Sequence, residues 1–381
     1  MKIINDIMAT RLLFFIMAFF VGLWTIRIPT IKDQIDTDYF GIGLVMATFA
    51  IGSIIAMVFA NNVIKMSSAR TVLLYTSILQ AILWLPTPFI SSLQLFMIFS
   101  FIFGLCFGSF EISCNLYASN LEKREKKSMM SGFHAFWSLG VLTGSIATSL
   151  FLEWNISFLN NVITYVIILL PLNIFIVLRL HVDQIANAEN NKHSIFFIWP
   201  LLIFILALIS MVNALTEGSV DAWGALYMRD FIQVDGFLIG LATVSFNIFM
   251  VIGRLSGDWI RDRIGVYNFL TILFITSIIS LFMLYSFDSI LAALCGFALL
   301  GIGTSAIIPI AYSLAGKAEG IDSGTAIAIV SIAVYGTFMG APATLGIIAN
   351  NYGVNSIFFP ILIIFLFVLP IIFASRRLFT K

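Results

Sequence analysis

Apolar stretches of membrane-spanning length recur along the whole chain and constrain what it can fold into. Each is close to the roughly 20 residues that an α-helix needs to cross a bilayer. In lipid, a single segment satisfies its own backbone hydrogen bonds as a helix. The sequence therefore predicts an all-α polytopic membrane protein with twelve transmembrane helices, at 10–30, 40–63, 71–91, 94–117, 129–151, 157–179, 196–228, 236–258, 266–286, 290–314, 323–347 and 354–375.

The composition agrees with that interpretation. Of 381 residues, 60% are hydrophobic and 10% charged, whereas about a quarter of residues are charged in a soluble domain. The net charge of +1 gives no reason to expect a nucleic-acid partner. The sequence contains no recognisable metal cluster, nucleophile triad or phosphate-binding loop. We therefore expect no cofactor and no enzymatic activity.

The distribution of basic residues predicts the orientation in the membrane. With the N-terminus taken as cytoplasmic, 17 of the 20 Lys and Arg residues fall on the inner side. This excess is typical of cytoplasmic loops. Both termini are therefore expected in the cytoplasm. The short loops and compact size favour a bacterial inner (plasma) membrane, and we expect a monomer.

A weak internal repeat divides the chain. The segment FGIGLVMA at 40–47 is echoed by FLIGLATV at 237–244, and the same offset of 197 residues carries Gly104 onto Gly301. Parallel six-helix repeats with a substrate cavity near the bilayer midplane are one layout of secondary transporters. The sequence thus predicts an N-terminal half at 1–180, a cytoplasmic linker at 181–194 and a C-terminal half at 195–381.

One acidic residue lies inside the fourth predicted span. Gly104, Gly108, Glu111 and Asn115 are spaced i, i+4, i+7 and i+11, so they share one helical stripe. The glycines permit close approach to a neighbouring helix. A carboxyl group removed from water at this depth can bind and release a proton as a cavity wets and dries. Glu111 is therefore a candidate proton-coupling residue and Asn115 a candidate solute ligand, although a structural hydrogen bond is the alternative.

The fifth span contributes His134, with Trp137 beside it. A histidine within a span can bind solute through its ring nitrogens or share a proton with Glu111. A helix-packing histidine satisfied by a neighbouring carbonyl is an equally good interpretation.

The seventh span carries the richest polar segment, NALTEGSVDAWGALYMRD. Gly218 and Gly224 are expected to loosen this helix, as in the discontinuous helices of transporters. The alternative places the segment at the outer interface, where aromatic residues form a belt. Candidate solute-binding residues here and in span eight are Glu217, Asp221, Trp223, Tyr227 and Asn247.

Charged residues near the ends of spans are candidate gating groups. Arg27 near the outer end of span one either pairs with an acid across a gate or extends its charged end to the interface. The segment GRLSGDWIRDRIG at 253–265 ends span eight, where alternating charges can stabilise one conformation. It contributes Arg254, Asp258, Arg261, Asp262 and Arg263.

The segment GDWIRDRIG resembles the loop signature of the major facilitator superfamily. The segments FEISCN, FHAFWSLGVLTG and EGSVDAWGALYMRD resemble the fucose permease-like branch of that family. The resemblance implies a major facilitator fold and a proton-coupling acid at Glu111. The family's second acid on span one has no counterpart between Arg11 and Lys32.

These features predict a secondary active transporter of a small polar solute, sugar-like by resemblance, that works by alternating access and proton coupling. A proton-driven exporter of a drug, toxin or metabolite is the alternative. Protons, the solute and the lipid bilayer are the expected partners.

Overall fold

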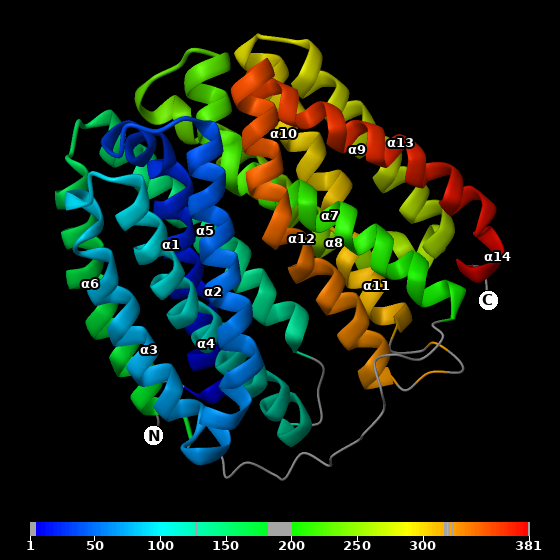
Figure 1. Ribbon diagram of the computed structural model, residues 1–381. Helices are drawn as coiled ribbons and strands as arrows, with labels where there is room; N and C mark the ends of the chain where they lie inside the picture. Colours follow the sequence, from blue (N-terminus) through cyan, green and yellow to red (C-terminus); the bar gives the residue numbers. More distant parts are fainter. Residues whose placement is uncertain are drawn as a thin grey trace. The chain divides into compact units, whose positions relative to one another are not determined.

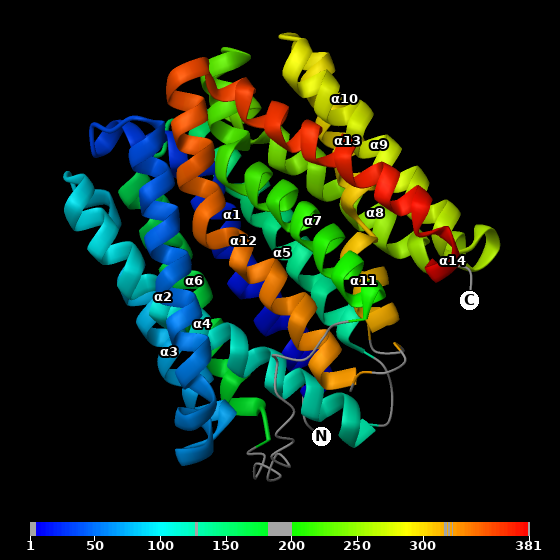
Figure 2. The same cartoon turned by 45° about the vertical axis from the view of Figure 1, so that its right-hand side comes forward.

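The structure is a computed structural model that describes residues 5–125, 129–181, 200–315, 318, 321 and 323–379. Among these residues, twelve helices are long and apolar enough to cross a membrane, and no strand is present. The twelve predicted spans are confirmed, with edges shifted by a few residues. The described part of the chain forms two compact units, shown in Figures 1 and 2.

Unit 1 comprises Met1–Glu189 and Asp235–Gly240. Its helices are α1 (Asp6–Gln34), α2 (Tyr39–Met66), α3 (Ala69–Trp84), η1 (Thr87–Phe89), α4 (Leu93–Glu125), α5 (Met130–Glu153), α6 (Phe158–Arg179) and η3 (Gly236–Gly240). The short helix η3 packs on α5, where the backbone N–H of Phe237 donates to Glu153 at 3.0 Å.

Unit 2 comprises Asn190–Val234 and Leu241–Lys381. Its helices are α7 (Leu201–Leu226), η2 (Tyr227–Phe231), α8 (Leu241–Ile264), α9 (Val266–Ser286), α10 (Ile290–Thr304), α11 (Ile307–Ala315), α12 (Ser323–Tyr352), η4 (Val354–Ile357), α13 (Phe358–Ala374) and α14 (Arg376–Phe379). The predicted linker at 181–194 lies outside the described residues, except for His181.

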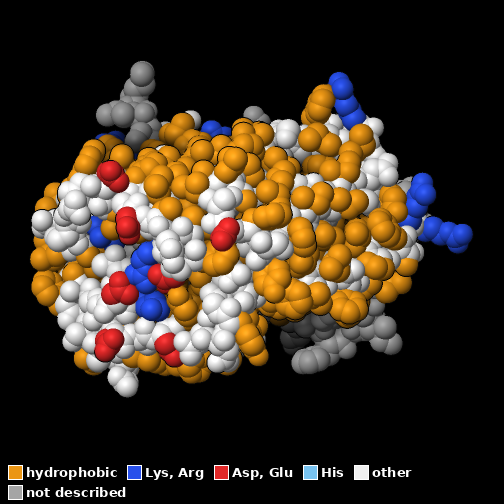
Figure 3. Space-filling view, turned by 90° about the horizontal axis from the view of Figure 1, so that it is seen from above, with side chains coloured by type: hydrophobic (Ala, Val, Ile, Leu, Met, Phe, Trp, Pro, Cys, Tyr) orange, Lys and Arg blue, Asp and Glu red, His pale blue; other side chains and the backbone are white. Residues whose placement is uncertain are grey.

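Polar caps begin several of these helices. Asn5, Asp38, Ser68, Ser157 and Ser289 each accept a hydrogen bond from a backbone N–H in the first turn of the following helix. Such caps satisfy N–H groups that have no partner within the helix. Between the caps, many large apolar side chains remain exposed, and hydrophobic side chains cover much of the face in Figure 3. This surface suits helices that face lipid.

The internal repeat is visible in how helices pack. In unit 1, a Cβ atom added to Gly104 on α4 would overlap the carbonyl oxygen of Phe49 on α2. In unit 2, a Cβ atom added to Gly301 on α10 would overlap the carbonyl oxygen of Phe246 on α8. Both members of the pair are shifted by the predicted 197 residues. The repeat therefore preserves a backbone-to-backbone contact.

We predict that Gly104→Ala and Gly301→Ala each destabilise the protein. The added methyl group has to push two helix backbones apart, and overpacking of this kind costs about 1–3 kcal/mol. Thermal unfolding of the purified protein in detergent measures the effect. The control is Gly336→Ala on α12, where an added Cβ meets nothing within 4 Å; it should leave the melting temperature unchanged or raise it, since alanine favours helix. Equal effects at all three positions would contradict the prediction.

Candidate functional site

The glycine face of α4 packs on α2, and Glu111 and Asn115 continue that face. An added Cβ on Gly108 would overlap the backbone of Ser53 on α2, so the predicted close approach is confirmed. Glu111 and Asn115 are half-buried, and Asn115 Nδ2 donates to the Glu111 backbone oxygen at 3.0 Å. Glu111 lies about two turns from the nearer end of the span Leu93–Ala118. The carboxylate is thus inside a span.

The two predicted site residues of α5, Trp137 and His134, contact different aromatic side chains. Trp137 meets the ring edge of Phe107, with centroids 6.3 Å apart, and Phe107 precedes Glu111 by one turn of α4. His134 lies in the first turns of α5, is exposed, and contacts Phe14 of α1 edge-on at 5.4 Å. Trp137 therefore contacts a residue of α4 that lies one turn before Glu111, whereas His134 lies near the end of its span.

In unit 2, acidic and basic side chains from α7 and α8 form a cluster within the spans. Glu217 accepts a hydrogen bond from Asn213 Nδ2 at 2.6 Å. The guanidinium of Arg254 on α8 faces the same carboxylate, with Nη2 and Oε2 3.5 Å apart. Asp221 follows Glu217 by one turn, and Glu217 and Arg254 are the charged groups that act on it. Arg254, predicted as a gating residue, thus joins two predicted solute-binding acids.

The tenth span is broken beside this cluster. Helix α10 ends at Thr304 and α11 begins at Ile307. Pro309 has no N–H group, so the carbonyl of Ser305, four residues earlier, has no helical donor. Arg254 Nε donates to that carbonyl at 3.4 Å. One arginine therefore links α7, α8 and the break between α10 and α11.

The predicted loosening of span seven is wrong. Helix α7 is continuous from Leu201 to Leu226 and contains both Gly218 and Gly224. The helix bends into π-helical geometry later, at Tyr227–Phe231. Each glycine costs a helix about 1 kcal/mol of stability, and the packing of the largely buried α7 offsets this cost. Proline, as in the tenth span, removes a backbone hydrogen bond altogether.

The aromatic side chains of span seven belong to the core of unit 2. Trp223 and Tyr227 are both 0% exposed. The Tyr227 hydroxyl donates to the Leu284 carbonyl at 2.9 Å, and its ring meets Phe297 and Phe358. In this arrangement, neither ring presents a face to a solute.

Asn247 on α8 is 5% exposed, and its Nδ2 donates to the backbone oxygen of Thr243, one turn earlier. Most of its side chain is therefore enclosed by protein, and its predicted contact with solute stays a prediction.

The charges at the end of α8 have local partners. Arg261 pairs with the adjacent Asp262 at 3.3 Å, and Arg263 lies over the Trp259 ring at 4.0 Å. The side chain of Asp258 lies outside the described residues. The predicted gating role of this segment stays a prediction.

Arg27 is buried, with 3% of its surface exposed, so it does not extend to the interface. Its Nε donates to Asn161 Oδ1 at 3.0 Å and its Nη2 to the Ile156 carbonyl at 2.8 Å. The guanidinium also lies over the Phe158 ring. Arg27 therefore links α1 to the start of α6 through neutral hydrogen-bond partners within unit 1.

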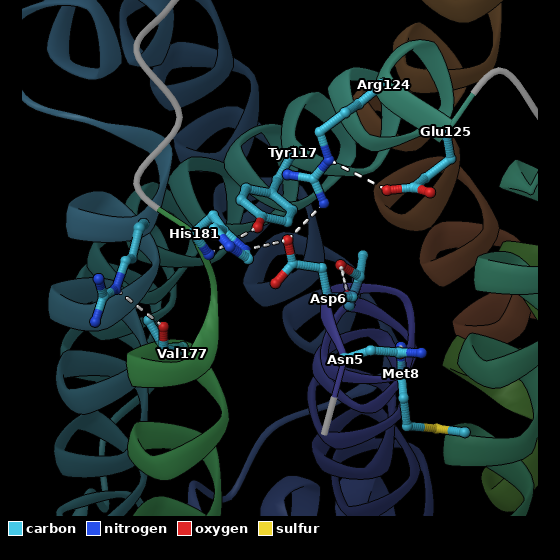
Figure 4. Close-up of polar contacts among 10 residues, drawn as sticks. Asn5, Asp6, Met8, Tyr117, Arg124, Glu125, Val177 and His181 are labelled. Carbon is cyan, nitrogen blue, oxygen red and sulfur yellow. Dashed lines mark hydrogen bonds and ion pairs between the residues drawn. The ribbon is translucent and has the colours of Figure 1, made fainter. Parts of the chain in front are cut away.

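A polar junction that the sequence analysis missed joins three helix ends of unit 1 (Figure 4). Asp6, the first residue of α1, is 6% exposed. Its Oδ2 accepts hydrogen bonds from Arg124 Nη2 in the last turn of α4 and from His181 Nδ1 after α6, each at 2.5 Å. The Tyr117 hydroxyl accepts from the backbone N–H of His181 at 3.1 Å. The Asp6 carboxylate raises the pKa of the Arg124 guanidinium further above its usual range.

The sequence held partial signals for these missed residues. Asp6 is an acid at a helix start and Arg124 a base at a helix end, both favoured by the helix dipole. Pro309 lies inside an apolar span, but Pro171, Pro342 and Pro370 lie inside continuous helices, so a proline alone does not predict the break. Nothing in the spacing pairs Asp6 with a residue 118 positions later.

We predict that Asp6→Asn lowers the melting temperature by several degrees, because Arg124 and His181 lose a shared carboxylate. Hydrogen bonds to charged groups contribute about 1.5–3 kcal/mol, less here because Arg124 is 39% exposed. The control is Glu125→Gln, which removes an exposed acid 3.3 Å from the same arginine and should change the melting temperature little. If the two variants behave alike, Asp6 does not hold the junction together.

Known membrane proteins are similar to this chain over most of its length. An uncharacterised MFS-type transporter of Yersinia pestis is 27% identical over 351 residues, covering 91% of this chain and 90% of the relative. The transporter y4wD of Sinorhizobium fredii is 28% identical over 70% of this chain and 71% of its own length. The membrane protein MosC of Rhizobium meliloti is 23% identical over 92% and 85%.

Solved structures share the fold. The nucleoside transporter NupG superposes with a TM-score of 0.74 at 14% identity, over 99% of this chain and 100% of that one. A bacterial homologue of the lysosomal transporter Spinster gives 0.71 at 13% identity, over 98% and 96%. These matches support the fold, and the fucose permease-like branch stays a prediction.

The sequence profile of the Major Facilitator Superfamily matches residues 11–230 and 204–379, which together cover nearly the whole chain. Together with the twelve spans, this match identifies the chain as a multi-pass membrane transporter, not an enzyme, that belongs to the Major Facilitator Superfamily.

Proposed function

We propose that this transporter moves a small polar solute, sugar-like by resemblance, across a bacterial inner membrane and couples that movement to protons through Glu111. It works as a monomer with both termini in the cytoplasm, and its two six-helix halves alternate access to the solute. The observation that carries the proposal is the position of Glu111 on a polar stripe inside a span of a Major Facilitator Superfamily protein.

The position of Glu111 supports a coupling role. Asp6, Asp33 and Glu153, the other carboxylates of the described spans of unit 1, lie at span ends. A charge inside a span costs free energy, up to about 2.5–3.5 kcal/mol at the bilayer centre by insertion scales. Retaining Glu111 at that cost is explained when the carboxyl group is protonated and deprotonated during transport.

The neighbouring polar groups supply candidate contacts for the solute. Asn115 lies one turn from Glu111 on α4. Trp137 of α5 contacts the ring of Phe107, which lies one turn before Glu111. In unit 2 the corresponding candidates are Glu217 and Asp221. His134, nearer the end of its span, is a candidate for passing protons between water and Glu111.

The solute and the direction of transport are identified first, with a panel of labelled sugars and polyols offered to right-side-out and inside-out vesicles. Reconstituted Glu111→Gln protein should then accumulate the solute at least about tenfold less under a pH gradient. It should still exchange labelled for unlabelled solute across the membrane, because exchange needs no net proton movement.

The matched control is Glu125→Gln, the same substitution at the exposed end of the same helix, which should keep both activities. Undiminished pH-driven accumulation by Glu111→Gln contradicts the coupling role. Loss of both accumulation and exchange assigns Glu111 to solute binding or folding instead.

A further inference from the structure

One corner of unit 2 gathers arginines beside aromatic rings. It is made of the end of α8, the start of α9 and the short helix α14, and both α8 and α14 pack on α9. Residues 258–267 together with α14 hold four arginines and two aspartates. One of the aspartates, Asp262, pairs with the adjacent Arg261 at 3.3 Å. The corner therefore carries a net positive charge.

This corner lies where three spans end or begin. The apolar span that contains α8 ends at Gly257, the span of α9 begins at Val266, and the span of α13, which leads into α14, ends at Ala374. Trp259 and Tyr267 lie within two residues of these ends. Tryptophan and tyrosine are enriched at the interface between membrane and water, at the depth of the lipid headgroups. The arginines of the corner are therefore expected at the same depth.

Two of the arginines lie over these aromatic rings. The Cζ atom of Arg263 is 4.0 Å from the centre of the Trp259 ring, and that of Arg376 is 5.2 Å from the centre of the Tyr267 ring. A guanidinium that stacks on a ring uses its flat face, so the N–H groups around its edge remain uncovered. Arg263 is exposed and makes no hydrogen bond or ion pair with the described residues. Its N–H groups are therefore held in place and available to an acceptor from outside the chain.

The surface beside Arg263 is apolar as well as cationic. Trp259 is 58% exposed, and Leu255, one turn earlier on α8, is 75% exposed. A phosphate ion from solution would leave both side chains uncovered. A phospholipid would cover them with its acyl chains and bring its phosphate to the guanidinium, where arginine forms short and often bidentate hydrogen bonds. The combination of cationic and apolar groups therefore fits an anionic phospholipid.

The equivalent corner of unit 1 is built differently. At the offset of 197 residues, Arg263 corresponds to Met66 and Tyr267 corresponds to Arg70. Arg70 donates to two backbone carbonyls at the end of α6, at 3.2 and 2.7 Å, so its guanidinium is already used within the protein. Met66 offers no donor to a phosphate. The paired arginine and tryptophan are therefore a feature of unit 2 and not of the repeat.

We propose that this corner of unit 2 binds the headgroup of an anionic phospholipid such as phosphatidylglycerol. Arg263 donates to the phosphate, Arg376 and Arg377 add positive charge from α14, and Trp259 and Leu255 contact the upper part of the acyl chains. Basic pockets between transmembrane helices are typical binding sites for anionic lipid headgroups. The site shares no residue with the proposed proton and solute contacts, so the inference stands independently of the proposed transport function.

Tryptophan fluorescence in reconstituted bilayers tests the proposal. A phospholipid brominated near its headgroup quenches the tryptophans that it contacts, and the difference between wild-type and Trp259→Phe protein isolates the signal of Trp259. Brominated phosphatidylglycerol should replace phosphatidylcholine beside Trp259 with a preference of about fivefold or more. Arg263→Gln should lower that preference about threefold to fivefold, because one arginine at an anionic lipid surface changes binding by about that factor.

The matched control is Lys32→Gln in unit 1. It also removes a cation that lies over an aromatic ring at a span end, since Lys32 Nζ is 4.9 Å from the centre of the Tyr39 ring. The preference beside Trp259 should be unchanged in this variant. Arg377→Gln on α14 is the second variant if Arg263→Gln disturbs the turn between α8 and α9, and it should also lower the preference.

Three results would overturn the proposal. The first is equal quenching of Trp259 by brominated phosphatidylglycerol and brominated phosphatidylcholine in wild-type protein. The second is an equal preference in the arginine variants and in Lys32→Gln, which would assign the effect to the general attraction between anionic lipid and the protein. The third is loss of the preference when inorganic phosphate replaces chloride at equal ionic strength, which would assign the corner to free phosphate.

Discussion

Lipid offers no hydrogen bonds, and this constraint governs the structure from the backbone to the charged side chains. Every N–H and C=O group in a span needs a partner within the protein. Long helices meet the requirement almost everywhere. A proline inside a span leaves the carbonyl four residues earlier without its helical donor; at Ser305, four residues before Pro309, the guanidinium of Arg254 donates instead. Arg254, the charged residue of α8 within its span, thus satisfies a backbone carbonyl that lacks a helical donor.

Arginines fill the same need elsewhere in the chain. Arg27 donates to the Ile156 carbonyl before α6, and Arg70 donates to the carbonyls of Val177 and Leu178 at the end of α6. Each guanidinium presents several donors in a fixed fork, so one side chain can satisfy a carbonyl and a second acceptor together. These hydrogen bonds connect helix ends of unit 1. At the junction around Asp6, a carboxylate accepts the hydrogen bond from the arginine in place of a carbonyl.

The internal repeat preserves a helix-packing contact but not the charged residues inside the spans. Gly104 and Gly301 oppose equivalent carbonyl oxygens 197 residues apart. At the same offset, Glu111 becomes Ile308, Arg254 becomes Met57 and Glu217 becomes Phe20. Close helix contact is needed in both halves because each half has to pack its own helices. A carboxylate inside a span is costly in lipid. At the equivalent positions of the other half, Glu111 and Glu217 are therefore replaced by apolar residues.

The sequence by itself determined the twelve spans and the repeat, because apolar length and period are local properties of the chain. It also singled out Glu111, Glu217 and Asp221, since charges inside spans stand out against an apolar background, and Arg254 as a charge at the end of span eight. The roles of these residues depend on contacts between distant segments, which no spacing encodes.

Only the tertiary structure decided that Arg254 faces Glu217 and Ser305, that α7 is continuous while the tenth span is broken, and that Trp223 and Tyr227 are core residues. The physical reason is that a polar group in lipid takes whichever partner folding brings to it, and the choice among partners is made by helix packing.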